Sequence, residues 1–302
     1  PSEIAPLSAN IVAEILHEAG VPAGVFNMVH GIGPVVGEAM SHHPGIDMMS
    51  FTGSKRGGVA VAQGAAKTVK RVSQELGGKS PNIILDDGMF EKSVRDGVNG
   101  TMSNTGQSCN APTRMLVPIS RHAEALSVAK AAAEQLIIGN PQDENTDIGP
   151  LVSETQFNKV QRLIESGISA GATLVTGGAG KPSDLDKGFY VKPTVFGNVD
   201  NKMEIAREEI FGPVLSIIPY GSDEEAIEIA NDTDYGLAAF ISGANKEKMM
   251  ELARKINAGQ ILLNYGSAGT DAPFGGFKQS GNGREKAEWG LEEFLEVKAI
   301  MG

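Results

Sequence analysis

The only cysteine of the chain, Cys109, lies in a glycine- and amide-rich stretch, "NTGQSCNAP", residues 104–112. A deprotonated thiol is a strong nucleophile, and backbone N–H groups in such a turn can stabilise a developing oxyanion. Many lone cysteines instead pack as small apolar residues. Because the apolar run 115–117 begins only after Cys109, the sequence favours an accessible thiol, and the packed alternative stays open.

A carboxylate lies at the end of another strand-like run, at Glu75 in "QELGGKSP", residues 74–81. Open α/β sheets bind ligands beyond the carboxyl ends of their strands. Beside an organic ligand, Glu75 would be desolvated, its pKa would rise, and it could act as a general base near neutral pH. The alternative is a surface glutamate at a strand end, which is the commoner case for a single glutamate.

Glycine turns provide candidate sites for phosphate groups. "GIGPVVG" at 31–37 is a weak nucleotide signal, whereas "FTGSKRGG" at 51–58 follows a predicted strand and opens a predicted helix. There Gly53, Ser54 and Gly58 could direct backbone N–H groups at a pyrophosphate. An ordinary strand-to-helix turn would explain the same letters.

Hydrophobic periodicity predicts an α/β fold. In residues 1–76 the pattern alternates between helices and strands, as in the second half of a Rossmann-type domain with a parallel, doubly wound sheet. The helices are expected at 7–19, from 31 to 40 and at 55–69, and the strands at 25–29, 46–51 and 69–76.

A second α/β unit is predicted from residue 77, and glycine pairs at 77–78 and 275–276 are candidate hinges. Its strands are expected at 79–87, 113–118, 172–178, in a pair around 189–196, and at 213–220, 238–243, 259–264 and 291–300; its helices are expected at 91–103, 121–138, 154–171, 223–233 and 245–257. We therefore predict a domain at 1–76, a thiol-bearing domain at 77–270, and a return segment with an oligomerisation strand at 271–302.

Composition narrows the class of protein. The 302 residues are 41% hydrophobic and 21% charged, which is enough for two globular domains. The net charge of −11 argues against a nucleic-acid partner. A single cysteine fits a reducing, cytoplasmic setting, no apolar run is long enough to span a membrane, and no signal peptide or metal-ligand spacing is recognised. Because residue 1 is not Met and opens a helical pattern, we interpret the chain as the C-terminal portion of a longer protein.

Five motifs in order, "FTGS", "QELGGKSPNIIL", "GQSC", "REEIFGPV" and "PFGGFKQSGNGRE", resemble the NAD(P)-dependent aldehyde dehydrogenase family over essentially all 302 residues. The resemblance implies a partial Rossmann-like cofactor domain followed by an α/β catalytic domain. It implies that Cys109 attacks an aldehyde, that its own N–H stabilises the oxyanion, and that Glu75 activates the water that hydrolyses the resulting thioester.

The resemblance also implies an NAD cofactor, with NADP possible. Glu3 would bind the adenosine ribose, which favours NAD, and Glu209 the nicotinamide ribose, whereas Glu285 would be a carboxylate near the proton path. The full set of implied cofactor residues is Glu3, Gly33, Gly37, Phe51, Thr52, Gly53, Ser54, Gly58, Leu76, Glu209 and Phe211. No metal is implied.

The chain also departs from the family pattern. A second oxyanion donor, an asparagine, and a cofactor-binding lysine would both precede residue 1. Since losing one such donor costs ~10²–10³ in rate, we expect this chain alone to be poorly active. The expected partners are a small-molecule aldehyde and further copies in a homodimer or homotetramer, with neither nucleic acid nor membrane. A CoA-acylating relative and a non-catalytic protein that retains the fold remain alternatives, and the aldehyde is not readable.

Overall fold

The computed structural model describes residues 1–267 and 269–302 and divides into two compact units, Pro1–Ser73 and Gln74–Gly302. The division falls inside strand β2 (Arg71–Glu75), whose last two residues belong to the second unit. The domain boundaries predicted at 76/77 and 270/271 remain predictions.

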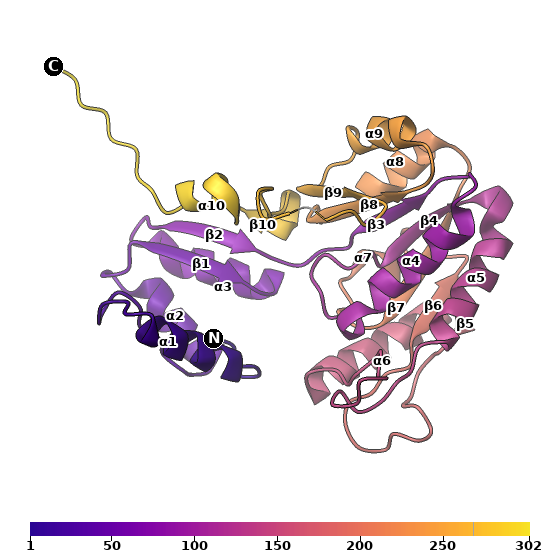
Figure 1. Cartoon of the computed structure of the whole chain (residues 1–302), viewed down its shortest axis with the longest axis horizontal. Helices are drawn as coiled ribbons and strands as arrows, with labels where there is room; N and C mark the ends of the chain where they lie inside the picture. Colours follow the sequence, from indigo (N-terminus) through magenta and orange to yellow (C-terminus); the bar gives the residue numbers. More distant parts are fainter. Residues whose placement is uncertain (268) are drawn as a thin grey trace. The chain divides into compact units, whose positions relative to one another are not determined.

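The first unit has the alternating pattern that the sequence predicts, except at one strand. Its elements (Figure 1) are α1 (Leu7–Glu18), α2 (Gly33–His42), β1 (Met48–Thr52), α3 (Lys55–Ala66) and the start of β2. A Cβ at Gly64 of α3 would lie 2.8 Å from the Cβ of Ser41 in α2. The missing side chain therefore lets α2 and α3 pack closely.

The strand predicted at 25–29 is wrong. In the described part of the chain this segment forms a single bridge, Ala23 to Phe26, and Val25 and Val29 are 72% and 62% exposed. A buried parallel strand requires backbone partners on its neighbours, and this segment has no such ladder. The helix predicted at 7–19 is confirmed, although four of its apolar side chains are exposed, namely Leu7, Ile11, Val12 and Ile15.

The second unit is built on a seven-stranded sheet in the order β5-β6-β7-β4-β3-β8-β9. All neighbours are parallel except β5, which runs antiparallel to β6. This confirms the predicted α/β class. The strands are β3 (Pro81–Ile84), β4 (Arg114–Pro118), β5 (Thr173–Thr176), β6 (Thr194–Gly197), β7 (Val214–Tyr220), β8 (Ala238–Ser242) and β9 (Gln260–Leu263).

Helices cover both faces of this sheet. Because successive strand residues point to opposite sides, neighbouring residues of one strand pack against different helices. Ile84 packs with α4 and α5, whereas its neighbour Ile83 packs with α8 and α9. A third core lies under α6 and α7. The helices (Figure 1) are α4 (Phe90–Met102), α5 (His122–Glu134), α6 (Glu154–Ser169), α7 (Glu204–Arg207), α8 (Asp223–Asn231), α9 (Lys246–Ala253) and α10 (Ala287–Glu292).

The strand register brings three chemically rich segments together. Arg114 at the start of β4 pairs with Pro81 of β3 on one side and Ser216 of β7 on the other. The segments that lead into these three parallel strands therefore meet at one edge of the sheet. They are 75–80, 107–113 and 208–213.

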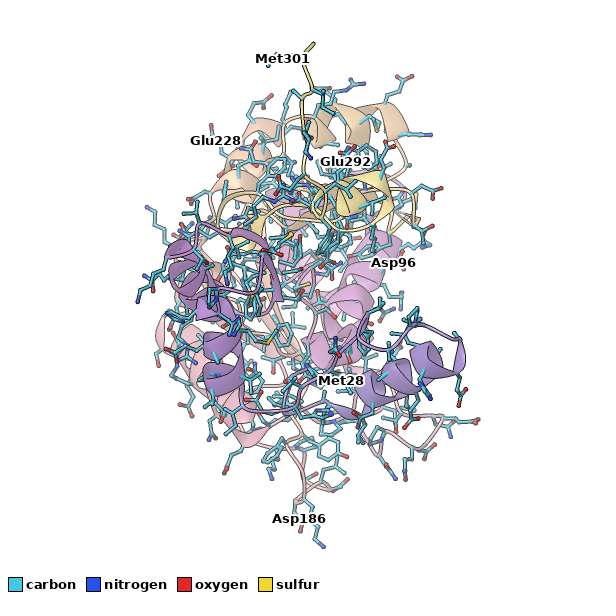
Figure 2. The ribbon with its side chains drawn as sticks, turned by 90° about the vertical axis from the view of Figure 1, so that its left-hand side faces the viewer. Met28, Asp96, Asp186, Glu228, Glu292 and Met301 are labelled. Atoms are coloured by element: carbon cyan, nitrogen blue, oxygen red, sulfur yellow. The ribbon has the colours of Figure 1, made fainter. Side chains whose placement is uncertain are left out.

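Two further predicted strands are absent from the described residues. The pair expected around 189–196 is a single strand, β6, and 291–300 contains the end of α10 followed by coil. Figure 2 shows this last segment as coil, with Met301 labelled near its end, and Val297 is 100% exposed. Its alternating pattern finds no partner strand in the second unit. The strand β10 (Gly281–Asn282) instead pairs with the last two residues of β2.

None of the helices among residues 1–267 and 269–302 combines the length and the apolar character that a membrane-spanning helix needs.

Candidate active site

Cys109 follows a tight left-handed turn between α4 and β4. Asn104, Thr105 and Gly106 have φ values of 51°, 58° and 69°. Residues other than glycine rarely adopt this left-handed region. A Cβ at Gly106 would overlap the carbonyl oxygen of Gly212. The turn therefore depends on a close approach to the segment that precedes β7, and it delivers Cys109 to the same edge of the sheet.

The thiol of Cys109 is half-buried. Burial raises the pKa of Cys109, and the charges of Glu209 and Glu75 raise it further, whereas the N–H groups of Cys109 and Asn110 act in the opposite direction. At rest the thiol is therefore protonated at neutral pH. A sulfur within electrostatic reach of two carboxylates differs from an inert cysteine packed among aliphatic side chains.

Glu75 is a buried carboxylate, 4% exposed, at the end of β2. Burial raises the pKa of Glu75 to about 7, with a further rise from Glu285 and an opposing effect from Arg284. Neither carboxylate oxygen has a hydrogen-bond partner in the part of the chain that the structure describes. A Cβ at Gly275 would lie 2.8 Å from Glu75 Oε1, so the 274–285 segment can approach this carboxylate only through a glycine.

The carboxylate of Glu209 is cradled by the two glycines that follow Leu76. The N–H of Gly78 donates to Glu209 Oε1 at 3.1 Å, and a Cβ at Gly77 would overlap the same carboxylate. Burial raises the pKa of Glu209. Leu76 itself is buried, and its N–H donates to the carbonyl of Ser280 at 2.9 Å.

Two polar side chains of α6 hold the turn that carries Glu209 and Phe211. Lys159 Nζ donates to the carbonyl of Glu209 at 2.6 Å. Gln156 Nε2 donates to the carbonyls of Ile210 and Phe211, both at 2.8 Å. The sequence analysis did not identify either side chain. The pattern that could have indicated them is a pair of polar residues at i and i+3 on a helix that otherwise covers an apolar core. They fix Phe211, whose φ of 57° needs such support.

In the first unit, Ser54 caps α3 and Phe51 lies against the start of this helix. The N–H of Gly57 donates to Ser54 Oγ at 3.2 Å, and that of Gly58 to the Ser54 carbonyl at 2.9 Å. A Cβ at Gly53 would lie 2.6 Å from the Phe51 ring. The Gly58 N–H therefore already donates within the first helical turn, and a contact of Gly58 with a pyrophosphate stays a prediction.

The structure brings Glu3 and Gly33 together although they are far apart in the sequence. A Cβ at Gly33, the first residue of α2, would lie 3.9 Å from Glu3 Oε2. Gly37 lies one turn later, where its carbonyl accepts from Ser41 Oγ at 2.7 Å, and Thr52 ends β1. The exposed Glu3 carboxylate and the N-terminus of α3 are features that suit a dinucleotide, since hydroxyls need acceptors and phosphates favour helix N-termini.

Among the described residues, no group of three or more His, Cys, Asp or Glu side chains is arranged to hold a metal ion.

Comparisons with known proteins agree with this arrangement. The model of the aldehyde dehydrogenase family matches residues 1–300. A 3-succinoylsemialdehyde-pyridine dehydrogenase from a Pseudomonas species is 52% identical over the whole chain, which spans 63% of that relative. The chain thus covers less than two thirds of the length of such relatives.

Solved structures show the same fold. Aldehyde dehydrogenase C from Pseudomonas syringae, a mutant crystallised with NAD+ and octanal, is 55% identical with a TM-score of 0.98, covering 99% of this chain and 62% of that one. An aldehyde dehydrogenase from Bartonella henselae is 48% identical with a TM-score of 0.96, covering 99% and 63%. Because the family model matches residues 1–300, the chain belongs to the aldehyde dehydrogenase family.

Proposed function

We propose that the protein of which this chain forms part oxidises an aldehyde to a carboxylic acid, with Cys109 as nucleophile and Glu75 as general base. One observation carries the proposal: the Gly77–Gly78 backbone, which follows the buried Glu75 by two residues, packs against both the Glu209 carboxylate and the carbonyl of Cys109. Burial also raises the pKa of Glu75 to about 7. A base that is half-ionised near neutral pH can both accept and release a proton.

The chemistry assigned to this chain has two stages. After the Cys109 thiol releases its proton to solvent water, the sulfur adds to the aldehyde carbon and forms a thiohemiacetal oxyanion, which the N–H of Cys109 stabilises. NAD+, when bound, supplies the hydride acceptor. The resulting thioester is cleaved when Glu75 takes a proton from water and the hydroxide adds to the acyl carbon, which releases the acid and restores the thiol.

Cofactor binding is proposed residue by residue. Glu209, with Phe211 beside it, would accept hydrogen bonds from the nicotinamide ribose, and Leu76 would lie against the nicotinamide. Glu3 would accept hydrogen bonds from the adenosine ribose and repel a 2′-phosphate, which favours NAD over NADP. Ser54 at the start of α3 would face the pyrophosphate. Related structures crystallised with NAD+ support this choice.

Assembly and setting are part of the same proposal. The coil after α10 carries exposed apolar residues, among them Val297, Ile300 and Met301. An alternating segment of this kind can add to a neighbouring sheet edge, so we propose a homodimer or homotetramer. A nucleophile that must stay a free thiol fits a reducing compartment such as the cytoplasm.

The test uses the full-length protein with a panel of aliphatic and aromatic aldehydes, including octanal, and with NAD+ or NADP+. We expect NADH and one equivalent of free acid without added CoA, and loss of NADH formation in Cys109→Ala. Acyl-CoA as the product when CoA is added, with no free acid in its absence, would indicate the acylating alternative. Absence of aldehyde-dependent NADH with every aldehyde, together with a Cys109 that resists alkylation even at pH 10, would favour the non-catalytic alternative.

A further inference from the structure

The turn before Cys109 has a backbone that its residue types disfavour. Asn104 and Thr105 both lie in the left-handed region, with φ values of 51° and 58°. A β-branched residue such as threonine rarely adopts this conformation, and residues in such conformations persist only where their surroundings hold them. Because Thr105 is 4% exposed, the surroundings in question are other parts of the second unit rather than solvent.

Two side chains of the turn bind one distant segment, residues 149–152. Thr105 Oγ1 donates to the carbonyl of Gly149 at 3.2 Å. Gln107 Oε1 accepts from the N–H of Val152 at 2.9 Å. The bonded residues are 44 and 45 positions apart in the sequence, so both bonds are tertiary contacts that hold the turn from outside.

The 149–152 segment is itself firmly held. Leu151 is buried in the core under α6, and its N–H donates to the carbonyl of Phe189 at 3.0 Å. The helix α6 begins directly after this segment, and its Gln156 supports the 209–211 turn. One stretch of chain therefore supports both the turn that carries the thiol and the turn that carries the Glu209 carboxylate.

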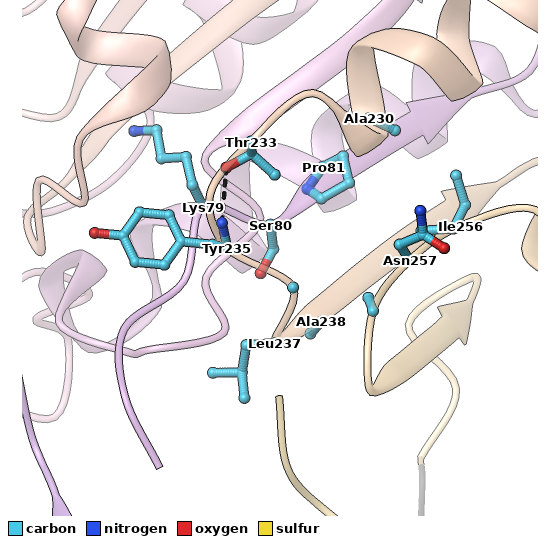
Figure 3. Close-up of a pocket in the computed structure, with 12 residues that line it drawn as sticks. Lys79, Ser80, Pro81, Ala230, Thr233, Tyr235, Leu237, Ala238, Ile256 and Asn257 are labelled. Atoms are coloured by element: carbon cyan, nitrogen blue, oxygen red, sulfur yellow. Dashed lines mark hydrogen bonds between the residues drawn. The ribbon is translucent and has the colours of Figure 1, made fainter. Parts of the chain in front are cut away.

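The backbone of Cys109 is already fixed on its other side by packing. A Cβ at Gly78 would overlap the carbonyl oxygen of Cys109 and would lie 3.3 Å from the Cβ of Leu237. The cavity that Leu237 lines together with Lys79 and Ser80 (Figure 3) has a volume of only about 10 Å³, which is room for one water molecule. The position of the thiol therefore depends on the turn that precedes it.

We propose that Thr105 and Gln107 are positioning residues that tie the left-handed turn to the 149–152 segment and thereby confine the Cys109 thiol to its half-buried place. The inference rests on the proposed function, because the confined sulfur is the one assigned to attack the aldehyde. Confinement directs the sulfur at one point and shields it from reagents that arrive from other directions. Loss of a tie therefore makes alkylation of the thiol faster and aldehyde oxidation slower.

Variants of the full-length protein remove each tie separately. Thr105→Val replaces the hydroxyl by a methyl group, Thr105→Ser keeps the hydroxyl, and Gln107→Met removes the acceptor. The matched control is Thr68→Val, because Thr68 Oγ1 in the first unit also donates to a backbone carbonyl at 3.2 Å. The readouts are the rate of alkylation of Cys109 by iodoacetamide at pH 8, measured by mass spectrometry of its peptide, and kcat with an aldehyde that the wild-type protein oxidises.

We expect alkylation about fivefold faster in Thr105→Val, since one hydrogen bond stabilises the held turn by about this factor. The increase is smaller in Gln107→Met, because Val152 is 47% exposed and water can pair with its N–H. The variant that carries both changes shows the product of the two increases, and its kcat falls about 10²-fold, as a displacement of about 1 Å causes. Thr105→Ser and Thr68→Val keep the wild-type alkylation rate and kcat.

Alkylation that is unchanged or slower in both Thr105→Val and Gln107→Met would overturn the proposal, and so would a Thr105→Ser variant that behaves like Thr105→Val. An equal acceleration in Thr68→Val would show a general loss of stability and would overturn it as well. If Thr105→Val does not fold, Gln107→Met, whose side chain is only half-buried, provides the same test. If the wild-type protein forms no NADH with any aldehyde, the proposed function fails, and the alkylation rates still decide whether the turn confines the thiol.

Discussion

Replacing Glu75 by glutamine removes the proposed general base without changing the size of the side chain. The wild-type carboxyl is 4% exposed and has a pKa of about 7, raised by burial and by Glu285 and opposed by Arg284. With that pKa the ionised fraction is about one tenth at pH 6 and about nine tenths at pH 8. A base-limited deacylation step therefore speeds up about tenfold between these pH values, whereas Glu75→Gln loses ~10²–10⁴ in that step.

Stopped-flow measurement of NADH with the full-length protein separates the two stages. In Glu75→Gln we expect one equivalent of NADH per site in a fast phase, followed by a slow steady state, because the acyl-enzyme accumulates. Glu285→Gln is the matched variant: removing this like charge lowers the pKa of Glu75, so the pH at half-maximal rate decreases. A normal steady-state rate in Glu75→Gln, or a pH midpoint near 4.5 in the wild-type protein, would refute the assignment.

The same carboxyl makes stability depend on pH. Its folded-state pKa of about 7 exceeds the ordinary glutamate pKa of 4.5, so the folded protein holds this proton more tightly than the unfolded chain. The associated stability is fully present below pH 4.5 and is lost as the pH rises through 7, a total of about 3 kcal/mol. In urea titrations, Glu75→Gln should lack this loss and be the more stable protein at pH 8. Equal slopes with pH would contradict the burial argument.

Three further outcomes follow from the site. Iodoacetamide should alkylate Cys109 slowly at pH 7 and increasingly fast toward pH 10, because the pKa of its thiol is raised; a rate that is already maximal at pH 7 would contradict this. Gly106→Ala should lower the free energy of unfolding by about 2–4 kcal/mol and reduce kcat, since its Cβ overlaps the Gly212 carbonyl. The control Gly171→Ala, with φ of +88° and open space around it, should cost only about 1–2 kcal/mol. Arg114→Met should lower the free energy of unfolding by about 3–5 kcal/mol in urea titrations, because it leaves several buried acceptors unpaired; a loss below 1 kcal/mol would show that water replaces the guanidinium.

Local chemistry allowed much of the site to be predicted. Cys109, Glu75 and Glu209 lie in short segments whose glycines and carboxylates are legible in the sequence, and the structure brings these three segments to neighbouring strands. Their catalytic and cofactor roles remain predictions. The sequence does not show that the Gly58 N–H already donates to the Ser54 carbonyl, because the residue types do not reveal which amides the first helical turn uses.

The sequence by itself determined the set of reactive groups, the helices other than α7 and α10, and the strands of the parallel sheet, because these depend on residue type and short-range periodicity. Only the tertiary structure decided which alternating segments become strands: 25–29 and 291–300 have the pattern but no ladder of backbone partners. It also decided the raised pKa of Glu75, and the support of the 209–211 turn by Gln156 and Lys159. Strand pairing and desolvation both arise from contacts between residues distant in the chain, and no local window of sequence contains them.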